Sequence, residues 1–187
     1  MKSSICFFLI VLGVSTSTVT WAQWNPEHPA NGNLSFTWIH GSLSAKANTD
    51  VRLQVHRYNE HTFILRQNPA VHWEAPFMYL LMGEKRAVLL DAGATEEAEY
   101  FPLRSVVDKV ILRWQQANAV EKLPLLVLTL GSDSSQNAAL VQFKDRPDTV
   151  IVNSDDGLRA AALGSQWPSK GVIDLGGRVL DVMTTPG

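Results

Sequence analysis

The spacing of hydrophobic and polar residues changes several times along the chain. Val51, Leu53 and Val55 alternate with polar residues, which is typical of a half-buried strand. "HTFILRQ" follows after a polar turn, and "PFMYLLMG" and "AVLLDAG" then flank "GEKR", which predicts a hairpin over residues 76–91. These short, mostly apolar strands predict a sheet that is covered on at least one face.

Residues 102–118 show the period of a helix. Pro102 fits the first turn, where its missing N–H costs nothing. Apolar side chains recur at steps of three and four residues and form one stripe, which we expect to be core. They are Leu103, Val106, Val107, Val110, Ile111, Trp114 and Ala117.

The rest of the chain continues the alternation of strands and helices. Residues 125–130 are almost wholly apolar, which is typical of a strand buried on both faces. Residues 149–153 predict a strand, residues 154–164 a short helix, and residues 171–187 two strands around Gly176 and Gly177. This order predicts one α/β domain with a mixed sheet and helices on one face.

The first 22 residues are typical of a secretory signal peptide. Lys2 precedes an apolar run at residues 5–14, and Thr20 and Ala22 fit a cleavage site before Gln23. A membrane anchor is the alternative, but a spanning helix needs roughly 20 apolar residues. We therefore expect export to the periplasm or the extracellular space, with no membrane attachment after cleavage.

Composition excludes several classes of function. The only cysteine, Cys6, lies in the signal segment, so the mature chain has no disulfide, cysteine nucleophile or cysteine metal ligand. Cleavage removes Lys2 and no acid, which leaves 15 basic against 18 acidic residues and a net charge of −3. No basic patch is present for nucleic acid. Residues 23–50, rich in Asn, Ser, Gly and Pro, predict an irregular arm pinned by Trp24, Phe36 and Trp38.

Residues 51–187 carry a family resemblance. "EAPFMYLLMGEKRAVLLDAGAT", a helix, "LPLLVLTL" with a polar loop, and finally "LGGRVLDVMTTPG" stand in the order found in metallo-β-lactamase-fold hydrolases. The segment Asp91-Ala92-Gly93 is similar to the family's Asp-x-Gly turn. The resemblance implies an αββα layered sandwich, here apparently incomplete at the C-terminus.

The loop after residues 125–130 departs from the family at its metal ligands. In the family that strand ends in His-x-His-x-Asp-His, and those four positions fall here on Gly131, Asp133, Ser135 and Gln136. A register shifted by one residue gives Leu130, Ser132, Ser134 and Ser135. Neither register contains a histidine, and the chain stops at Gly187, where the family places a further ligand.

The resemblance implies zinc as the cofactor, but the replaced residues predict that no zinc binds and that the chain has no cofactor. Zinc needs imidazole, thiolate or carboxylate ligands, and a serine hydroxyl or glutamine amide is a poor substitute. Asp91 and Asp133 together would favour a weak calcium or magnesium site. We expect no catalytic residue, and the former-site candidates are Asp91, Gly131, Asp133, Ser135 and Gln136.

Other side chains offer little replacement chemistry. The histidines form no close pair at metal spacing; they are His28, His40, His56, His61 and His72. We expect His56 and His61 to be solvated and His72 to lie on the surface, with a contact at the rim of the site as the alternative for His72. The serines of "GSDSSQ" predict a polar loop that caps the following helix. Asp91 is expected to shape the turn rather than act as a base.

Two classes of function remain open. One is an exported hydrolase-like protein of the metallo-β-lactamase fold without activity, and the other is a non-catalytic binding or scaffold protein that takes an unknown small molecule. Because the second sheet is incomplete, residues 125–130 are expected to lack one cover. That predicts a truncated reading of a longer gene, a homo-oligomer through an exposed sheet face, or poor solubility, and we favour truncation.

Overall fold

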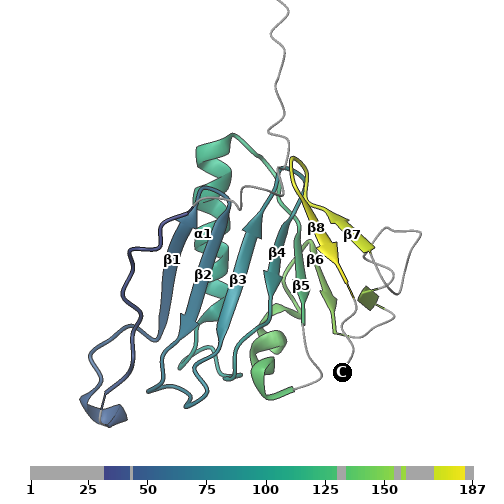
Figure 1. Cartoon of the computed structure of the whole chain (residues 1–187). Helices are drawn as coiled ribbons and strands as arrows, with labels where there is room; N and C mark the ends of the chain where they lie inside the picture. The colour runs from purple at the N-terminus through teal and green to yellow at the C-terminus, as the bar shows by residue number, and fades with distance from the viewer. Residues whose placement is uncertain (1–31, 43, 130–133, 154–156, 159–170, 184–187) are drawn as a thin grey trace, which may run out of the picture.

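The computed structural model describes residues 32–42, 44–129, 134–153, 157–158 and 171–183 (Figure 1). The predicted signal peptide lies outside these residues, as does most of the helix predicted at residues 154–164. Within them, the predicted alternation of strands and helices is confirmed.

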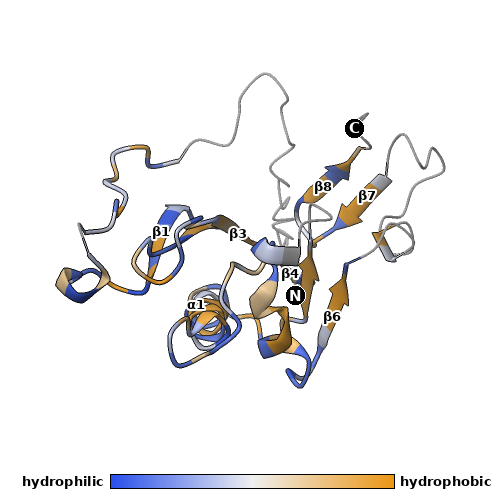
Figure 2. Ribbon diagram, turned by 90° about the horizontal axis from the view of Figure 1, so that it is seen from below, coloured by the Kyte–Doolittle hydropathy of each residue, from blue (hydrophilic) through white to orange (hydrophobic). Residues whose placement is uncertain are grey.

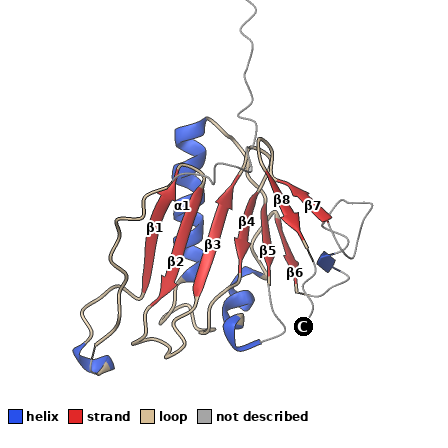
Figure 3. Cartoon of the chain, viewed as in Figure 1, coloured by secondary structure: helices blue, strands red, loops and turns tan. Residues whose placement is uncertain are grey.

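Six strands form one mixed sheet in the order β1-β2-β3-β4-β5-β6 (Figure 3). The first four pair antiparallel, and β4, β5 and β6 pair parallel. The hairpin predicted around "GEKR" is formed by β3 and β4. The strand bounds are β1 (Leu53–Asn59), β2 (Thr62–Gln67), β3 (Phe77–Met82), β4 (Ala87–Leu90), β5 (Leu125–Leu128) and β6 (Thr149–Val152).

The helix α1 (Leu103–Asn118) connects β4 to β5 and covers one face of the sheet, called here the helix face (Figure 2). Pro102 is the residue before the first turn rather than part of it. The stripe predicted from the sequence supplies Leu103, Val107, Ile111 and Trp114 to the core. Each such side chain, fully buried, contributes roughly 1.5–3 kcal/mol to folding. Trp114 also donates its Nε1–H to the Glu60 carbonyl at 3.0 Å.

A second, smaller sheet lies on the opposite face, over β4, β5 and β6 (Figure 2). It is the hairpin of β7 (Gly171–Asp174) and β8 (Val179–Val182), which confirms the two strands predicted around Gly176 and Gly177. Ile173 and Leu175 of this hairpin pack in one cluster with Leu126 and Leu128 of β5. The expectation that this strand lacks one cover is therefore wrong: alternate side chains of β5 are buried on both faces.

The β7–β8 turn is fastened to the β3–β4 turn. The backbone N–H groups of Lys85 and Arg86 donate to the Leu175 carbonyl at 2.8 and 3.2 Å. Lys85 Nζ also lies 2.6 Å from Asp174 Oδ2. This hydrogen bond, and a second one from the Gly176 N–H, hold the pKa of the Asp174 carboxyl below its ordinary value. These contacts explain why a two-stranded hairpin keeps one position over the sheet.

Arg178 adds a contact between this hairpin and the large sheet. It donates through Nη1 to the His61 carbonyl at 2.9 Å and contacts Thr62 Oγ1 at 3.3 Å, at the turn between β1 and β2. Burial lowers the pKa of the Arg178 guanidinium, because removal from water penalises the charged form. The hairpin is therefore held both at its own turn and at the start of β2.

In the described part of the N-terminal arm, residues 32–42 and 44–50, the one helical element is the short 3₁₀ helix η1 (Ala45–Ala47). The arm covers β1, β2 and β3 on the side opposite α1, called here the arm face. Phe36 stacks on His56 with ring centroids 4.0 Å apart, and Trp38 meets the Phe77 ring edge-on at 5.0 Å. The pinning roles of Phe36 and Trp38 are confirmed, whereas Trp24 lies outside the described residues.

His56 corrects one prediction. It is buried, at 4% exposure, instead of solvated, and its Nε2 lies 2.7 Å from the Asn33 carbonyl oxygen. The arm covers the face on which alternation places this side chain, so burial follows from a contact that the strand pattern alone does not contain. His61 is exposed, as predicted.

Part of the arm face stays open to solvent. Phe77 and Tyr79 of β3 are 36% and 40% exposed, although β3 lies in the interior of the sheet. The predicted homo-oligomer was assigned to an uncovered face of residues 125–130, which the β7–β8 hairpin covers, and association of two copies stays a prediction. Among the described residues, no helix has the length and apolar character needed to span a bilayer.

Candidate functional site

The turn after β4 carries the Asp-x-Gly motif. Asp91 adopts a left-handed conformation with φ 61°, and Gly93 does the same with φ 74°. The Asp91 N–H donates to the Leu128 carbonyl at 2.8 Å, which ties the end of β4 to the end of β5. A Cβ on Gly93 would lie 2.5 Å from the Phe101 ring, so no larger residue fits there without displacing the core. The Asp91 backbone thus takes part in the turn, and the predicted role of its side chain stays a prediction.

Gln67, at the end of β2, supports the same turn from the helix face. It is fully buried, and its Oε1 accepts the Ala94 N–H at 2.8 Å while its Nε2 donates to Thr95 Oγ1 at 2.7 Å. A buried amide with both ends satisfied orders the backbone around it. Sequence reasoning passed over Gln67 because a glutamine in a strand gives no local signal of such a role.

Asn137 joins this turn to the loop after β5. Its Oδ1 accepts the Ala92 N–H at 3.1 Å, and its backbone forms a parallel bridge with Gly93. Both Asn137 and Ala92 are buried, at 9% and 0% exposure. Two segments 45 residues apart are thus held together by a neutral amide. The sequence contains Asn137 directly after "GSDSSQ", but its role depends on the turn lying opposite.

The described part of this loop holds the short 3₁₀ helix η2 (Ser134–Gln136), followed by η3 (Ala138–Phe143). Asn137 stands at the N-cap of η3 without a side-chain capping bond. The expectation that residues 131–136 cap the next helix stays a prediction, and the segment that follows is a 3₁₀ helix. The Asn137 side chain is instead used for the contact with Ala92.

Ser135 is in contact with an acid from the loop between β2 and β3. Its Oγ lies 3.4 and 3.3 Å from the two carboxylate oxygens of Glu74. His72 lies beside Glu74, with Nδ1 3.9 Å from Oε2, and its side chain is 27% exposed. The contact with the loop is made by Glu74, and the rim contact that the sequence left as the alternative for His72 stays a prediction. Glu74 was not among the predicted residues.

These three side chains do not form a serine-nucleophile triad. In such a triad a histidine stands between the serine and the acid and takes the proton from the hydroxyl. Here the carboxylate of Glu74 stands between Ser135 and His72, so these three side chains are in the wrong order for that proton transfer. A carboxylate 3.3 Å from an exposed hydroxyl accepts a hydrogen bond but is a weak base toward it.

Three predicted site residues remain: Gly131, Asp133 and Gln136. Gly131 and Asp133 lie outside the described residues, and Gln136 is exposed. Within the described ranges, no group of three His, Cys, Asp or Glu side chains is placed to hold a metal ion. Serine, glutamine and asparagine at this loop are neutral donors that suit zinc poorly. The donor set present does not fit the zinc site that the family resemblance implies.

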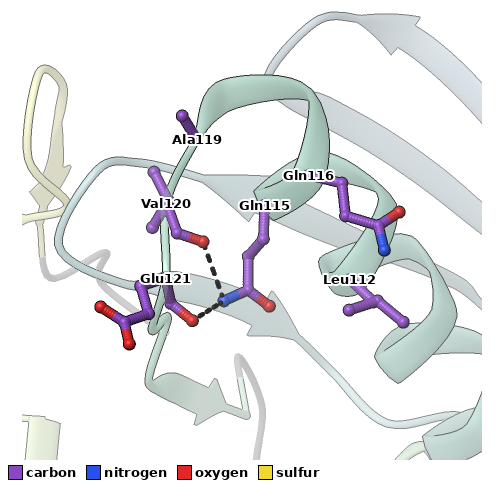
Figure 4. Close-up of a pocket in the computed structure, with 6 residues that line it drawn as sticks. All are labelled: Leu112, Gln115, Gln116, Ala119, Val120 and Glu121. Carbon is purple, nitrogen blue, oxygen red and sulfur yellow. Dashed lines mark hydrogen bonds between the residues drawn. The ribbon is translucent and has the colours of Figure 1, made fainter.

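A shallow pocket of about 350 Å³ lies at the C-terminal end of α1, away from this loop (Figure 4). The Gln115 amide in it donates to the carbonyls of Val120 and Glu121, at 3.4 and 3.0 Å. That amide completes the end of the helix, where Ala119 turns left-handed. The pocket brings no nucleophile and base together.

Comparison with known proteins gives likenesses of fold. No family profile and no curated protein matches the chain. Among solved structures it is similar to a metallo-β-lactamase from Pontibacter korlensis, with 16% identity and a TM-score of 0.43 over 69% of this chain and 59% of that one. It is also similar to the metallo-β-lactamase FIM-1 from Pseudomonas aeruginosa in the mono-zinc form, with 7% identity and a TM-score of 0.39 over 68% of this chain and 60% of that one.

Both structures are metallo-β-lactamases, the family whose resemblance the motifs indicated. The chain spans about three fifths of the length of each, 59% and 60%. The α/β assignment itself rests on the sheet order and on the two covered faces described above. What the matched enzymes do is carried to this chain only as a proposal.

Proposed function

We propose that this chain is an exported, metallo-β-lactamase-like protein that binds no catalytic zinc and hydrolyses no substrate by zinc chemistry. The observation that carries the proposal is the side-chain chemistry where the Asp91 turn meets the loop after β5. The buried link there is the Asn137 amide on the Ala92 N–H, and the exposed hydroxyl of Ser135 is bonded to Glu74. Catalytic zinc takes three protein ligands from imidazole, thiolate or carboxylate.

The test is the zinc content of the purified protein after incubation with zinc and removal of the excess, measured by elemental mass spectrometry. We expect far less than one zinc per chain, and no zinc-dependent hydrolysis of a chromogenic β-lactam, a thioester or a lactone. A matched variant in which Gly131→His, Asp133→His, Ser135→Asp and Gln136→His rebuild the family motif serves as the comparison. This variant is expected to take up more zinc than the natural chain, because the four changes place imidazole and carboxylate ligands at the loop.

Near-stoichiometric zinc in the unchanged protein would overturn the proposal. His72 is the first residue to test in that case, because it is the histidine that the described structure brings toward the loop, through Glu74. Loss of the zinc in His72→Ala would identify a rebuilt site that uses His72. Asp91→Asn is a second variant, which tests whether Asp91 belongs to that site.

Export is part of the same proposal and rests on residues 1–22, with Thr20 and Ala22 before the expected cleavage site. We expect the protein from an expressing bacterium to leave the cytoplasm and to begin at Gln23. Cell fractionation followed by intact-mass measurement checks both points. A product that keeps Met1 and stays with the cytoplasmic fraction would refute export.

A further inference from the structure

A second pocket, of about 310 Å³, lies between α1 and the two segments that lead into β5 and β6. Its walls bring together Arg104 and Asp108 of α1, Lys122 before β5, and Arg146 and Asp148 before β6. These charged side chains come from three separate parts of the chain. The pocket lies at the start of β5, whereas the loop that carries the family resemblance follows the end of that strand.

Two arginines share one carboxylate in this pocket. Arg146 Nε lies 2.7 Å from Asp108 Oδ1, and Arg104 Nε lies 3.7 Å from Asp108 Oδ2. Lys122 has an acid of its own, since its Nζ lies 2.9 Å from Asp148 Oδ1. The corner formed by Arg104, Asp108 and Arg146, called here the arginine corner, therefore carries one excess positive charge.

The acid that balances this charge lies toward the other end of the pocket. Glu121 is exposed and also lines it, so the three basic and three acidic residues sum to zero. The Glu121 carbonyl accepts the Gln115 amide, and Gln115 lies 115 − 108 = 7 residues beyond Asp108 in α1. Seven residues span roughly 10 Å of helix, about one Debye length in physiological salt. The charge of the arginine corner is therefore only partly offset.

Both arginines keep N–H groups that no acceptor in the described part of the chain takes up. Arg146 Nη1 donates to the Pro147 carbonyl and to Thr149 Oγ1, at 3.3 and 3.0 Å. Arg104 Nη1 donates to the Gln142 carbonyl at 3.3 Å. The Nη2 of each arginine has no such partner among these residues. Neither Nη2 atom is buried, so a ligand in solution can reach both.

A carboxylate fits the arginine corner better than a doubly charged anion does. Guanidinium presents parallel N–H groups that match the two oxygens of a carboxylate. A single negative charge neutralises the excess of the corner, whereas a second one would be repelled by Asp108 and Asp148. Leu123 and Pro147 also line the pocket and provide apolar surface for a short alkyl chain.

We propose that Arg104 and Arg146 bind the carboxylate of a short-chain monocarboxylic acid in this pocket. The carboxylate accepts hydrogen bonds from the two Nη2 groups, and the alkyl chain lies against Leu123 and Pro147. Neither zinc nor the loop after β5 takes part, so this proposal stands or fails separately from the proposed function.

The test is an NMR titration of the purified protein with butyrate at constant ionic strength, following the backbone amides of residues 146–149 and the arginine Nε–H signals. Butyramide, which has the same shape without charge, and inorganic phosphate, which has charge without an alkyl chain, are titrated in parallel. We expect saturable shifts with butyrate and at least about tenfold weaker binding of the other two. Phosphate binding as tight as butyrate would overturn the carboxylate assignment, and shifts that do not saturate would overturn the site.

Two arginine variants locate the site. Arg146→Gln is expected to weaken butyrate binding by about tenfold or more, since it removes a charge-assisted pair. Arg113→Gln is the matched control, because Arg113 is an exposed arginine of α1 that does not line the pocket. It makes the same change in net charge and should leave binding unchanged. Equal affinities of the two variants would refute the proposal.

Asp108→Asn tests the charge argument from the opposite direction. It removes the carboxylate that competes for both guanidinium groups, so butyrate should bind at least about threefold tighter. Unchanged or weaker binding would contradict the proposal. If Arg146→Gln fails to fold, as judged from the dispersion of its amide spectrum, Arg104→Gln takes its place. Arg104 is 37% exposed and lies farther from Asp108, so its replacement disturbs the fold less, and the same weakening is expected.

Discussion

Replacement of Asn137 by alanine tests the contact that closes the candidate site. The Asn137 Oδ1 accepts the Ala92 N–H at 3.1 Å, and Ala92 is fully buried. In Asn137→Ala that donor loses its acceptor while the surrounding residues still exclude water. An unsatisfied buried backbone donor costs about 1–3 kcal/mol of unfolding free energy.

Urea denaturation measures this cost. With an m-value of about 2 kcal/mol/M, a loss of that size lowers the midpoint by roughly 0.5–1.5 M. Hydrogen exchange of the Ala92 amide gives a local readout, and we expect it to exchange faster in the variant. Because Ala92 lies in the Asp91 turn, the same experiment reports whether that turn stays ordered without the link.

Two further variants separate the hydrogen bond from other effects. Asn137→Asp keeps an oxygen acceptor at the same place, and the Ala92 amide should remain protected in it. Gln136→Ala changes an exposed neighbour and should stay within about 0.5 kcal/mol of the natural protein. If Asn137→Ala is as stable as Gln136→Ala, the reasoning that this amide holds the two segments together is refuted.

Two other predictions concern the turn of the β7–β8 hairpin. Gly176→Ala should destabilise the protein by about 2 kcal/mol or more in urea, because φ is +81° and the new Cβ would lie 2.6 Å from the Lys85 backbone N. Gly177→Ala should cost less, since its Cβ would meet only the flexible end of Glu84, at 3.2 Å; equal costs would contradict the steric argument. The lowered pKa of Asp174 predicts that its contribution to stability is complete above the unfolded value of 3.8 and is lost as pH falls through the lower folded value. Asp174→Asn should remove this acid-side loss in urea midpoints measured on both sides of that range, and an unchanged pH profile would argue against the Lys85 pair as its cause.

The local elements could be read from the sequence because backbone geometry imposes a fixed period on each of them. Alternation at Leu53 and Val55 and the three-to-four spacing from Leu103 to Trp114 predicted β1 and α1, and both are present. Which side chains follow β5 is likewise a property of the sequence alone: residues 131–137 contain no histidine. The proposal that no catalytic zinc binds starts from that composition.

The tertiary structure decided which residues meet across long separations. Ser135 and Glu74 are 61 residues apart, and their contact exists because the β2–β3 loop and the loop after β5 lie at one end of the sheet. Likewise β5 is covered on both faces because the β7–β8 hairpin folds over it, which corrected the expectation of a bare face.

His56 and Arg66 show the same limit within single strands. Alternation places both side chains on the arm face, but the pattern contains no information about what covers that face. The arm buries His56, whereas no described acceptor reaches the Nε of Arg66. Burial and hydrogen bonding of a side chain depend on neighbours from distant segments, and only the folded chain brings those neighbours into place.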